Sequence, residues 1–168
     1  HSVAPAFIDL LKELKNKKNI TKIHCNWLEH WGGIFKAHPW LSGPKDSYLG
    51  FSKRGGGSLM EHSHGFHMLL IVINQLGLEI NKTNFCINKD LSNSYDKYVN
   101  IVFDLENGSE NLVATYTTDV LTKEITKKIV VETEKEVLSV EFGVNNGSFD
   151  IFQNKSEKQV SNKIYKKK

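Results

Sequence analysis

The sequence predicts a mainly β protein, in which an antiparallel meander forms a barrel or a strongly curved sheet beside one N-terminal amphipathic helix. Three observations support this fold class. Six segments in the second half of the chain alternate between apolar and polar residues. Asn-Gly turn signals separate several of them, and only one segment has clear helical periodicity. An α+β cone is the alternative, because the apolar run 59–77 is compatible with a helix as well as with a strand.

The helix is predicted over residues 5–16. Phe7, Leu10, Leu11 and Leu14 recur at helical spacing, and charged side chains occupy the opposite side. We expect this helix to close one side or one end of the sheet.

The segment 23–40 contains all three tryptophans of the chain. Trp27 and Trp31 are four residues apart, which favours a helix in the first half, and Gly32-Gly33 then predicts a change to a strand over 34–37. Large aromatic rings anchor cores and line binding sites. The candidate ligand-binding residues are therefore Trp27, Trp31, Phe35 and Trp40.

Strands account for most of the remaining chain. The loop 53–58 contains three consecutive glycines and predicts a mobile hairpin or linker, while the segments 106–109 and 145–147 predict tight hairpin turns. The last residues, 156–168, lack an apolar face and predict a basic tail that is a short helix or disordered, after one domain over 1–155. The predicted strands are 48–53, 83–88, 97–105, 111–118, 125–132, 137–144 and 148–153.

Length and composition exclude several classes of protein. A chain of 168 residues with 39% hydrophobic and 24% charged residues is typical of one globular domain. No apolar run approaches the roughly twenty residues of a membrane-spanning helix. The net charge of +3 comes from the C-terminal lysines, so no nucleic-acid partner is expected. Cys25 and Cys86 leave both pairing and compartment open, and a secreted or a cytoplasmic location fits equally well.

One short motif resembles a known superfamily. Asn26-Trp27 followed by Trp31-Gly32-Gly33-Ile34-Phe35 is similar to the tryptophan-and-glycine first strand of the calycins, the lipocalin-like barrels. The resemblance implies a lipocalin-like barrel. A barrel of this size holds side chains or one small ligand. We therefore expect a non-enzymatic binding protein for a small apolar ligand or a protein partner.

Three histidines near the centre of the chain indicate an alternative function. On a strand, His62 and His64 share one face about 6 to 7 Å apart, a spacing that lets both bind one metal ion. His67 joins them if the chain bends at Gly65, and Glu61 is the nearest candidate base. The alternative is a metal-dependent hydrolase or lyase, with zinc as a possible cofactor. Histidines that are simply hydrogen-bonded near a core strand explain the same pattern.

Overall fold

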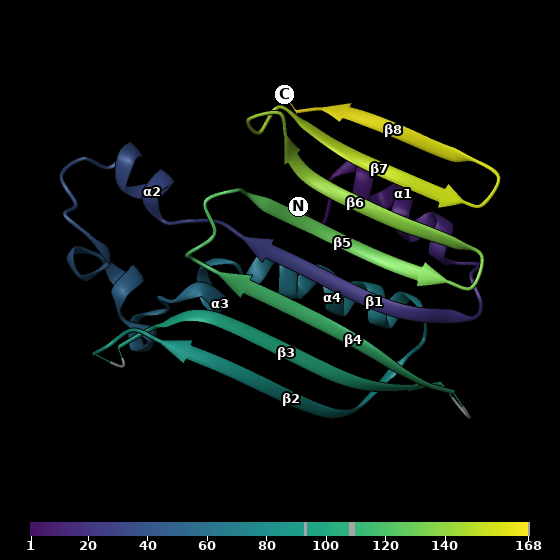
Figure 1. Cartoon of the computed structure of the whole chain (residues 1–168), viewed down its shortest axis with the longest axis horizontal. Helices are drawn as coiled ribbons and strands as arrows, with labels where there is room; N and C mark the ends of the chain where they lie inside the picture. Colours follow the sequence, from purple (N-terminus) through teal and green to yellow (C-terminus); the bar gives the residue numbers. More distant parts are fainter. Residues whose placement is uncertain (93, 108–109, 168) are drawn as a thin grey trace.

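The computed structural model describes residues 1–92, 94–107 and 110–167, which form one open eight-stranded sheet with helices on one face (Figure 1). Only β1 and β4 run parallel, and every other neighbouring pair is antiparallel. Across the sheet the strands are β2 (Glu79–Lys89), β3 (Asp96–Asn107), β4 (Glu110–Asp119), β1 (Ile20–Leu28), β5 (Thr126–Thr133), β6 (Glu136–Val144), β7 (Phe149–Ser156) and β8 (Val160–Lys166).

The predicted barrel is wrong. The edge strands β2 and β8 do not pair with each other in the described part of the chain, so the sheet stays open. A sheet must bury its apolar face against something, and closure is only one way to do so. Here α1 (Pro5–Leu14) and α4 (Ser63–Gln75) cover that face (Figure 1).

The helix α4 accounts for the error. Its buried positions follow helical spacing and point at the sheet. The predicted barrel requires this apolar run to be a strand. In the α+β alternative, this segment is a helix. The buried residues of α4 are Gly65, Met68, Leu69, Val72 and Ile73.

The aromatic segment also differs from its prediction. The expected helix around Trp27 is the strand β1, in which Ile23, Cys25 and Trp27 alternate inward against α4. The expected strand 34–37 lies instead in α2 (Gly32–Ala37). The predicted strand 48–53 consists of the 3₁₀ turns Tyr48–Gly50 and Ser52–Arg54.

The parallel pair β1 and β4 joins two antiparallel halves of the sheet. One half contains β2, β3 and β4, and the other contains β1 and β5 to β8. Ile23 lies opposite Ala114 at the start of this seam, and Leu28 lies opposite Asp119 at its end. The C-terminal ends of both strands therefore meet at the same end of the sheet, where α4 begins.

The other predicted strands are confirmed within a few residues. At the turn between β6 and β7, Asn145, Asn146 and Gly147 all have positive φ angles, as an Asn-Gly hairpin requires. Part of the predicted turn 106–109 lies outside the described residues. The expected tail 156–168 contains the strand β8, and none of the described helices is long and apolar enough to cross a membrane.

Two of the three glycines ahead of α3 (Ser58–Glu61) are tightly packed, although the sequence predicted a mobile hairpin or linker here. Gly56 and Gly57 are buried, and a methyl group on Gly56 would lie 2.2 Å from the carbonyl oxygen of Tyr48. Gly57 has a φ of 97°, and a methyl group there would lie 2.2 Å from Oδ1 of Asp96. This segment therefore needs glycine for two reasons, the backbone angle and the space.

We expect Gly57→Ala to lower the free energy of unfolding by about 2 to 4 kcal/mol, because both backbone strain and a clash with Asp96 would result. Urea denaturation measures this change. Gly55→Ala is the matched control: Gly55 also has a positive φ, 84°, but open space around it. Its cost should be about 1 kcal/mol. Equal costs for the two variants would contradict the packed arrangement of Gly57.

Candidate functional site

The candidate site lies where α3 and α4 meet the C-terminal ends of β1 and β4. Asp96, at the start of β3, fixes the first turn of α3 there. One oxygen of its carboxylate accepts hydrogen bonds from Ser58 Oγ at 2.7 Å and from the Leu59 backbone N–H at 2.8 Å. These bonds satisfy a backbone donor that the helix leaves free at its N-terminus. No local sequence pattern points to Asp96, because its partners are distant along the chain.

His62 connects α3 to α4 and points into the protein. Its side chain is buried, and Nδ1 lies 2.8 Å from the Thr118 hydroxyl of β4. Tyr116, also on β4, donates a hydrogen bond to the His62 backbone oxygen at 2.7 Å. Burial lowers the pKa of His62 below its ordinary value of 6.5. His62 is therefore a neutral, hydrogen-bonded part of the interior.

His64 lies on the first turn of α4 and is exposed to solvent. Its ring centroid is 5.5 Å from that of His1, whose ring in turn packs edge-on against Trp27 at 5.0 Å. Gly65 follows directly, and a methyl group there would lie only 2.6 Å from the Trp27 ring. Buried neighbours on both sides, His62 and Gly65, thus hold His64 on a fixed backbone.

A lysine and a glutamate complete this end of the sheet. Lys127 of β5 forms an ion pair with Glu29 at 2.6 Å, and its Nζ lies 6.0 Å from the Trp27 ring centroid. Tyr48 donates a hydrogen bond to Glu61 at 2.8 Å. This end of the sheet therefore carries side chains of both signs of charge.

The three histidines of the expected metal site do not converge. His62 is buried against Thr118, whereas His64 and His67 are exposed on α4. Over residues 1–92, 94–107 and 110–167, no three His, Cys, Asp or Glu residues are grouped so that they could hold a metal ion. The pattern His-Ser-His shares one face only on a strand, and here the chain is turning into a helix.

The four aromatic residues expected to bind a ligand lie in separate environments. Trp27 is buried in the main core, while Trp31 belongs to a small second cluster with Leu49 and Val120. Phe35 packs at the edge of that second cluster, with its ring centroid 6.1 Å from Trp31. Trp40 is 73% exposed. In the described part of the chain the sheet is open, so these residues line no barrel mouth.

Both cysteines are free thiols. Cys25 is buried, and burial raises the pKa of its thiol. Its Sγ lies 3.5 Å from the Gly65 carbonyl oxygen, under α4. Cys86 is exposed on β2, at the edge of the sheet. The raised pKa keeps the Cys25 thiol protonated near neutral pH.

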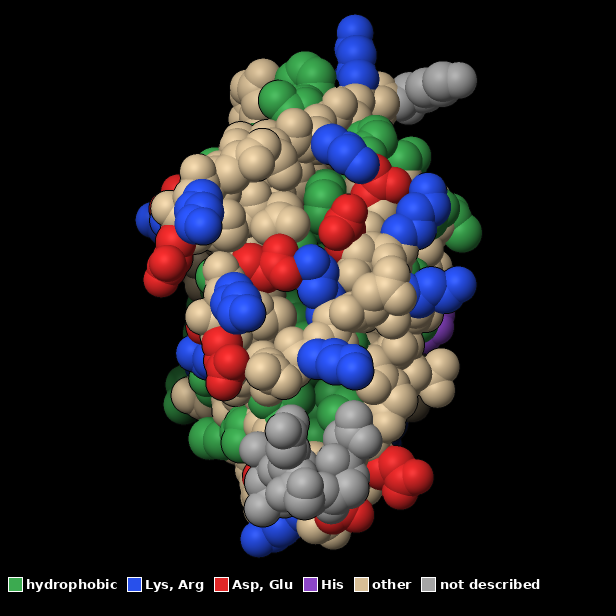
Figure 2. Space-filling model, turned by 90° about the vertical axis from the view of Figure 1, so that its right-hand side faces the viewer, with side chains coloured by type: hydrophobic (Ala, Val, Ile, Leu, Met, Phe, Trp, Pro, Cys, Tyr) green, Lys and Arg blue, Asp and Glu red, His purple; other side chains and the backbone are tan. Residues whose placement is uncertain are grey.

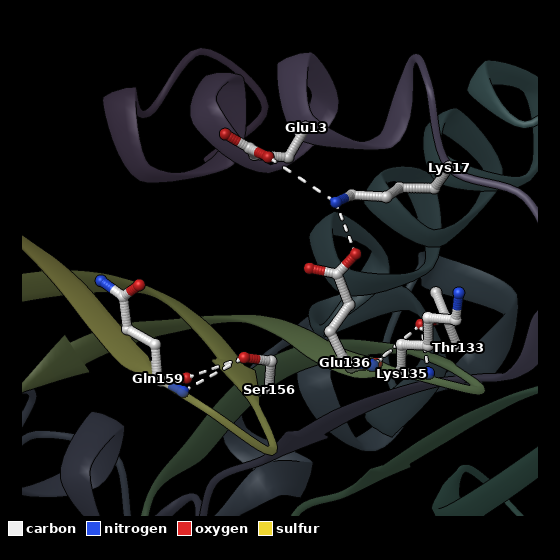
Figure 3. A network of polar contacts seen from close by, with 7 residues as sticks. All are labelled: Glu13, Lys17, Thr133, Lys135, Glu136, Ser156 and Gln159. Atoms are coloured by element: carbon white, nitrogen blue, oxygen red, sulfur yellow. Dashed lines mark hydrogen bonds and ion pairs between the residues drawn. The ribbon is translucent and has the colours of Figure 1, made fainter.

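A polar hollow of about 300 Å³ lies at the opposite end of the sheet, lined by residues 16–19 and 133–136. Figure 2 shows lysine and acidic side chains interspersed over this end of the molecule. Lys17 lies between Glu136 at 2.5 Å and Glu13 at 3.9 Å (Figure 3). The two ion pairs tie α1 to the turn between β5 and β6, which is a structural role.

We expect the free energy of unfolding to fall as the pH drops from 7 to 5, partly because of His62. Its pKa is lowered in the folded state, so the unfolded chain takes up the proton first below pH 6.5 and the folded state loses stability. Urea denaturation of His62→Gln at several pH values should show a shallower slope. His67→Gln, an exposed control on α4, should keep the slope of the wild type. If His62→Gln retains the full slope, His62 is not the titrating group.

No protein-family model and no curated protein matches the sequence. Solved structures do match. An inositol dehydrogenase homologue from Azotobacter vinelandii, complexed with NAD+, superposes with a TM-score of 0.65 at 9% identity, over 96% of this chain and 41% of that one. KijD10, a 3-ketoreductase from Actinomadura kijaniata, gives 0.64 at 12% identity, over 99% and 46%. The transcriptional regulator Gal80p from Kluyveromyces lactis gives 0.64 at 15%, over 98% and 44%.

These likenesses correct the family assignment. The calycin resemblance is wrong, and the lipocalin-like binding protein for an apolar ligand that was inferred from the barrel is not supported. The metal-dependent hydrolase or lyase has no support among these neighbours either. The chain spans less than half the length of the solved structures it matches. Its open mixed sheet has the same fold as part of these solved structures.

Proposed function

We propose that this chain is an oxidoreductase-family domain that contacts a polyhydroxylated substrate through His64. The observation that carries the proposal is the placement of His64: an exposed imidazole on a fixed backbone at the head of α4. The solved structures with this fold include an inositol dehydrogenase homologue and a UDP-N-acetylglucosamine 3-dehydrogenase from Acidithiobacillus ferrooxidans. Cyclitols and sugars both present several hydroxyl groups.

The chemistry of His64 suits such a substrate. An imidazole can donate a hydrogen bond to a hydroxyl oxygen or accept its proton near neutral pH. A proton-transfer group works best when its backbone and its neighbours are rigid. The inward hydrogen bonds of His62 and the contact of Gly65 with Trp27 supply that rigidity. His67 is also exposed and also lies between buried residues, Gly65 and Met68, but it is one turn further along α4 from the end of the sheet where that helix begins.

The residues of this chain do not fit a nicotinamide dinucleotide. Dinucleotide sites of the doubly wound type use a parallel sheet and a glycine-rich turn between a strand and a helix. The only parallel pair here is β1 with β4 in the described sheet, and Gly55-Gly56-Gly57 packs against Tyr48 and Asp96. The proposal therefore assigns only substrate contact and proton exchange to these 168 residues.

An NMR titration tests the proposal. With inositol and UDP-N-acetylglucosamine as probes, we expect chemical-shift changes centred on His64 and the first turn of α4. His64→Gln should weaken binding about fivefold to tenfold, the value of a lost hydrogen bond. His67→Gln is the matched control and should bind as the wild type does.

Two results would count against this function. If neither probe binds, the proposed substrate role of His64 is wrong. Binding that survives His64→Gln unchanged would instead favour a regulatory role without proton transfer. That role is the main alternative, because the solved structures with this fold include the transcriptional regulator Gal80p.

A further inference from the structure

The hydrogen bond between His62 and Thr118 can run in either direction. Nδ1 of the imidazole lies 2.8 Å from the Thr118 hydroxyl oxygen, and both residues are buried. A hydroxyl has one hydrogen to donate, and a ring nitrogen donates only when it carries a proton. The protonation state of His62 therefore determines which of the two residues is the donor.

A second acceptor lies within reach of the same hydroxyl. The Ser58 backbone oxygen, in the first turn of α3, is 3.3 Å from Thr118 Oγ1. This oxygen also accepts the helical hydrogen bond from the His62 backbone N–H at 3.0 Å, and a carbonyl oxygen has a second lone pair for Thr118. Because Thr118 has a single hydroxyl hydrogen, it donates to Nδ1 of His62 or to Ser58, but not to both.

The other side of the imidazole fixes the position of the proton in the neutral ring. The ring forms a hydrogen bond with the Trp27 backbone that favours the protonated ring, so the Trp27 carbonyl oxygen is the acceptor. Since Nδ1 faces Thr118, the donor to Trp27 is Nε2. A neutral imidazole carries only one ring proton. Nδ1 of neutral His62 is therefore unprotonated and accepts the hydroxyl hydrogen of Thr118.

We propose that protonation of His62 reverses this bond and acts as a pH-sensitive switch between α3 and β4. With both ring nitrogens protonated, Nδ1 donates to Thr118, and the released hydroxyl hydrogen turns to the Ser58 carbonyl oxygen. The first turn of α3 is then anchored through Asp96 on β3 and also through Thr118 on β4. With neutral His62, the Asp96 anchor holds α3 without Thr118. The switch does not depend on substrate contact by His64.

Three charged side chains act on the charge of His62. Glu29 and Glu61 favour the protonated ring, and Lys127 opposes it. Glu29 and Lys127 are paired with each other at 2.6 Å. Tyr116 donates to the His62 backbone oxygen and stays protonated, since burial raises the pKa of its hydroxyl. Burial outweighs these charges and lowers the pKa of His62, so the switch operates on the acid side of pH 6.5.

Nitrogen NMR of the His62 ring tests the starting state. The ¹⁵N shifts of a neutral imidazole differ according to which ring nitrogen carries the proton. Near neutral pH we expect the proton on Nε2, and both nitrogens should become protonated as the pH is lowered through the titration of the ring. A neutral ring with its proton on Nδ1 overturns the proposal, because acid then leaves the bond to Thr118 in the same direction. A ring that stays neutral until the protein unfolds overturns it as well.

The carbonyl carbon of Ser58 reports the switch itself. In the wild type its ¹³C resonance should move with the same midpoint as the His62 ring, because carbonyl shifts respond to a new hydrogen bond. Thr118→Val keeps the shape of the side chain without its hydroxyl, so the ring should still titrate while most of the Ser58 movement is lost. Thr118→Ser is the matched control and should retain that movement. An equal movement in Thr118→Val, or none in the wild type, shows that Thr118 does not connect His62 to α3.

Discussion

The contact between Gly65 and Trp27 determines how the rest of the molecule packs. A methyl group at Gly65 would come within 2.6 Å of the indole ring, so only glycine lets α4 approach β1 this closely. That approach puts Met68, Leu69 and the following apolar residues of α4 into the main core. Once the helices cover the apolar face of the sheet, closure into a barrel brings no further burial, and the polar outer face can stay in solvent.

The same contact separates the buried His62 from the exposed His64 and His67. At the turn into α4, one residue separates the inward His62 from the outward His64, so the two imidazoles have opposite environments despite their spacing. Burial of His62 carries a desolvation cost, which its hydrogen bond to Thr118 offsets. His64 stays at the surface, with its ring beside that of His1. Sequence spacing identified the histidines, but the helix geometry determined their environments.

Local alternation predicted the strands β3, β5 and β6 well, because each has one apolar and one polar face. The features missed by the sequence interpretation depend on residues far apart in the chain. Asp96 holds Ser58, and Thr118 holds His62, across intervals that no local pattern reveals. The four-residue spacing of Trp27 and Trp31 suggested a helix, although the first belongs to a strand and the second to the start of α2.

The barrel prediction addressed a real physical problem, since a long meander has two edges with free backbone groups. Closure would have removed both edges, but the parallel seam between β1 and β4 keeps β2 and β8 at opposite sides of the sheet. Each edge therefore needs its own solution. Lysines and the bonds to Asp9 protect β8. The edge of β2 is instead interrupted by register shifts near both of its ends, between Ile80 and Lys82 and between Asn88 and Lys89, and such irregularities make a free edge a poorer template for another strand.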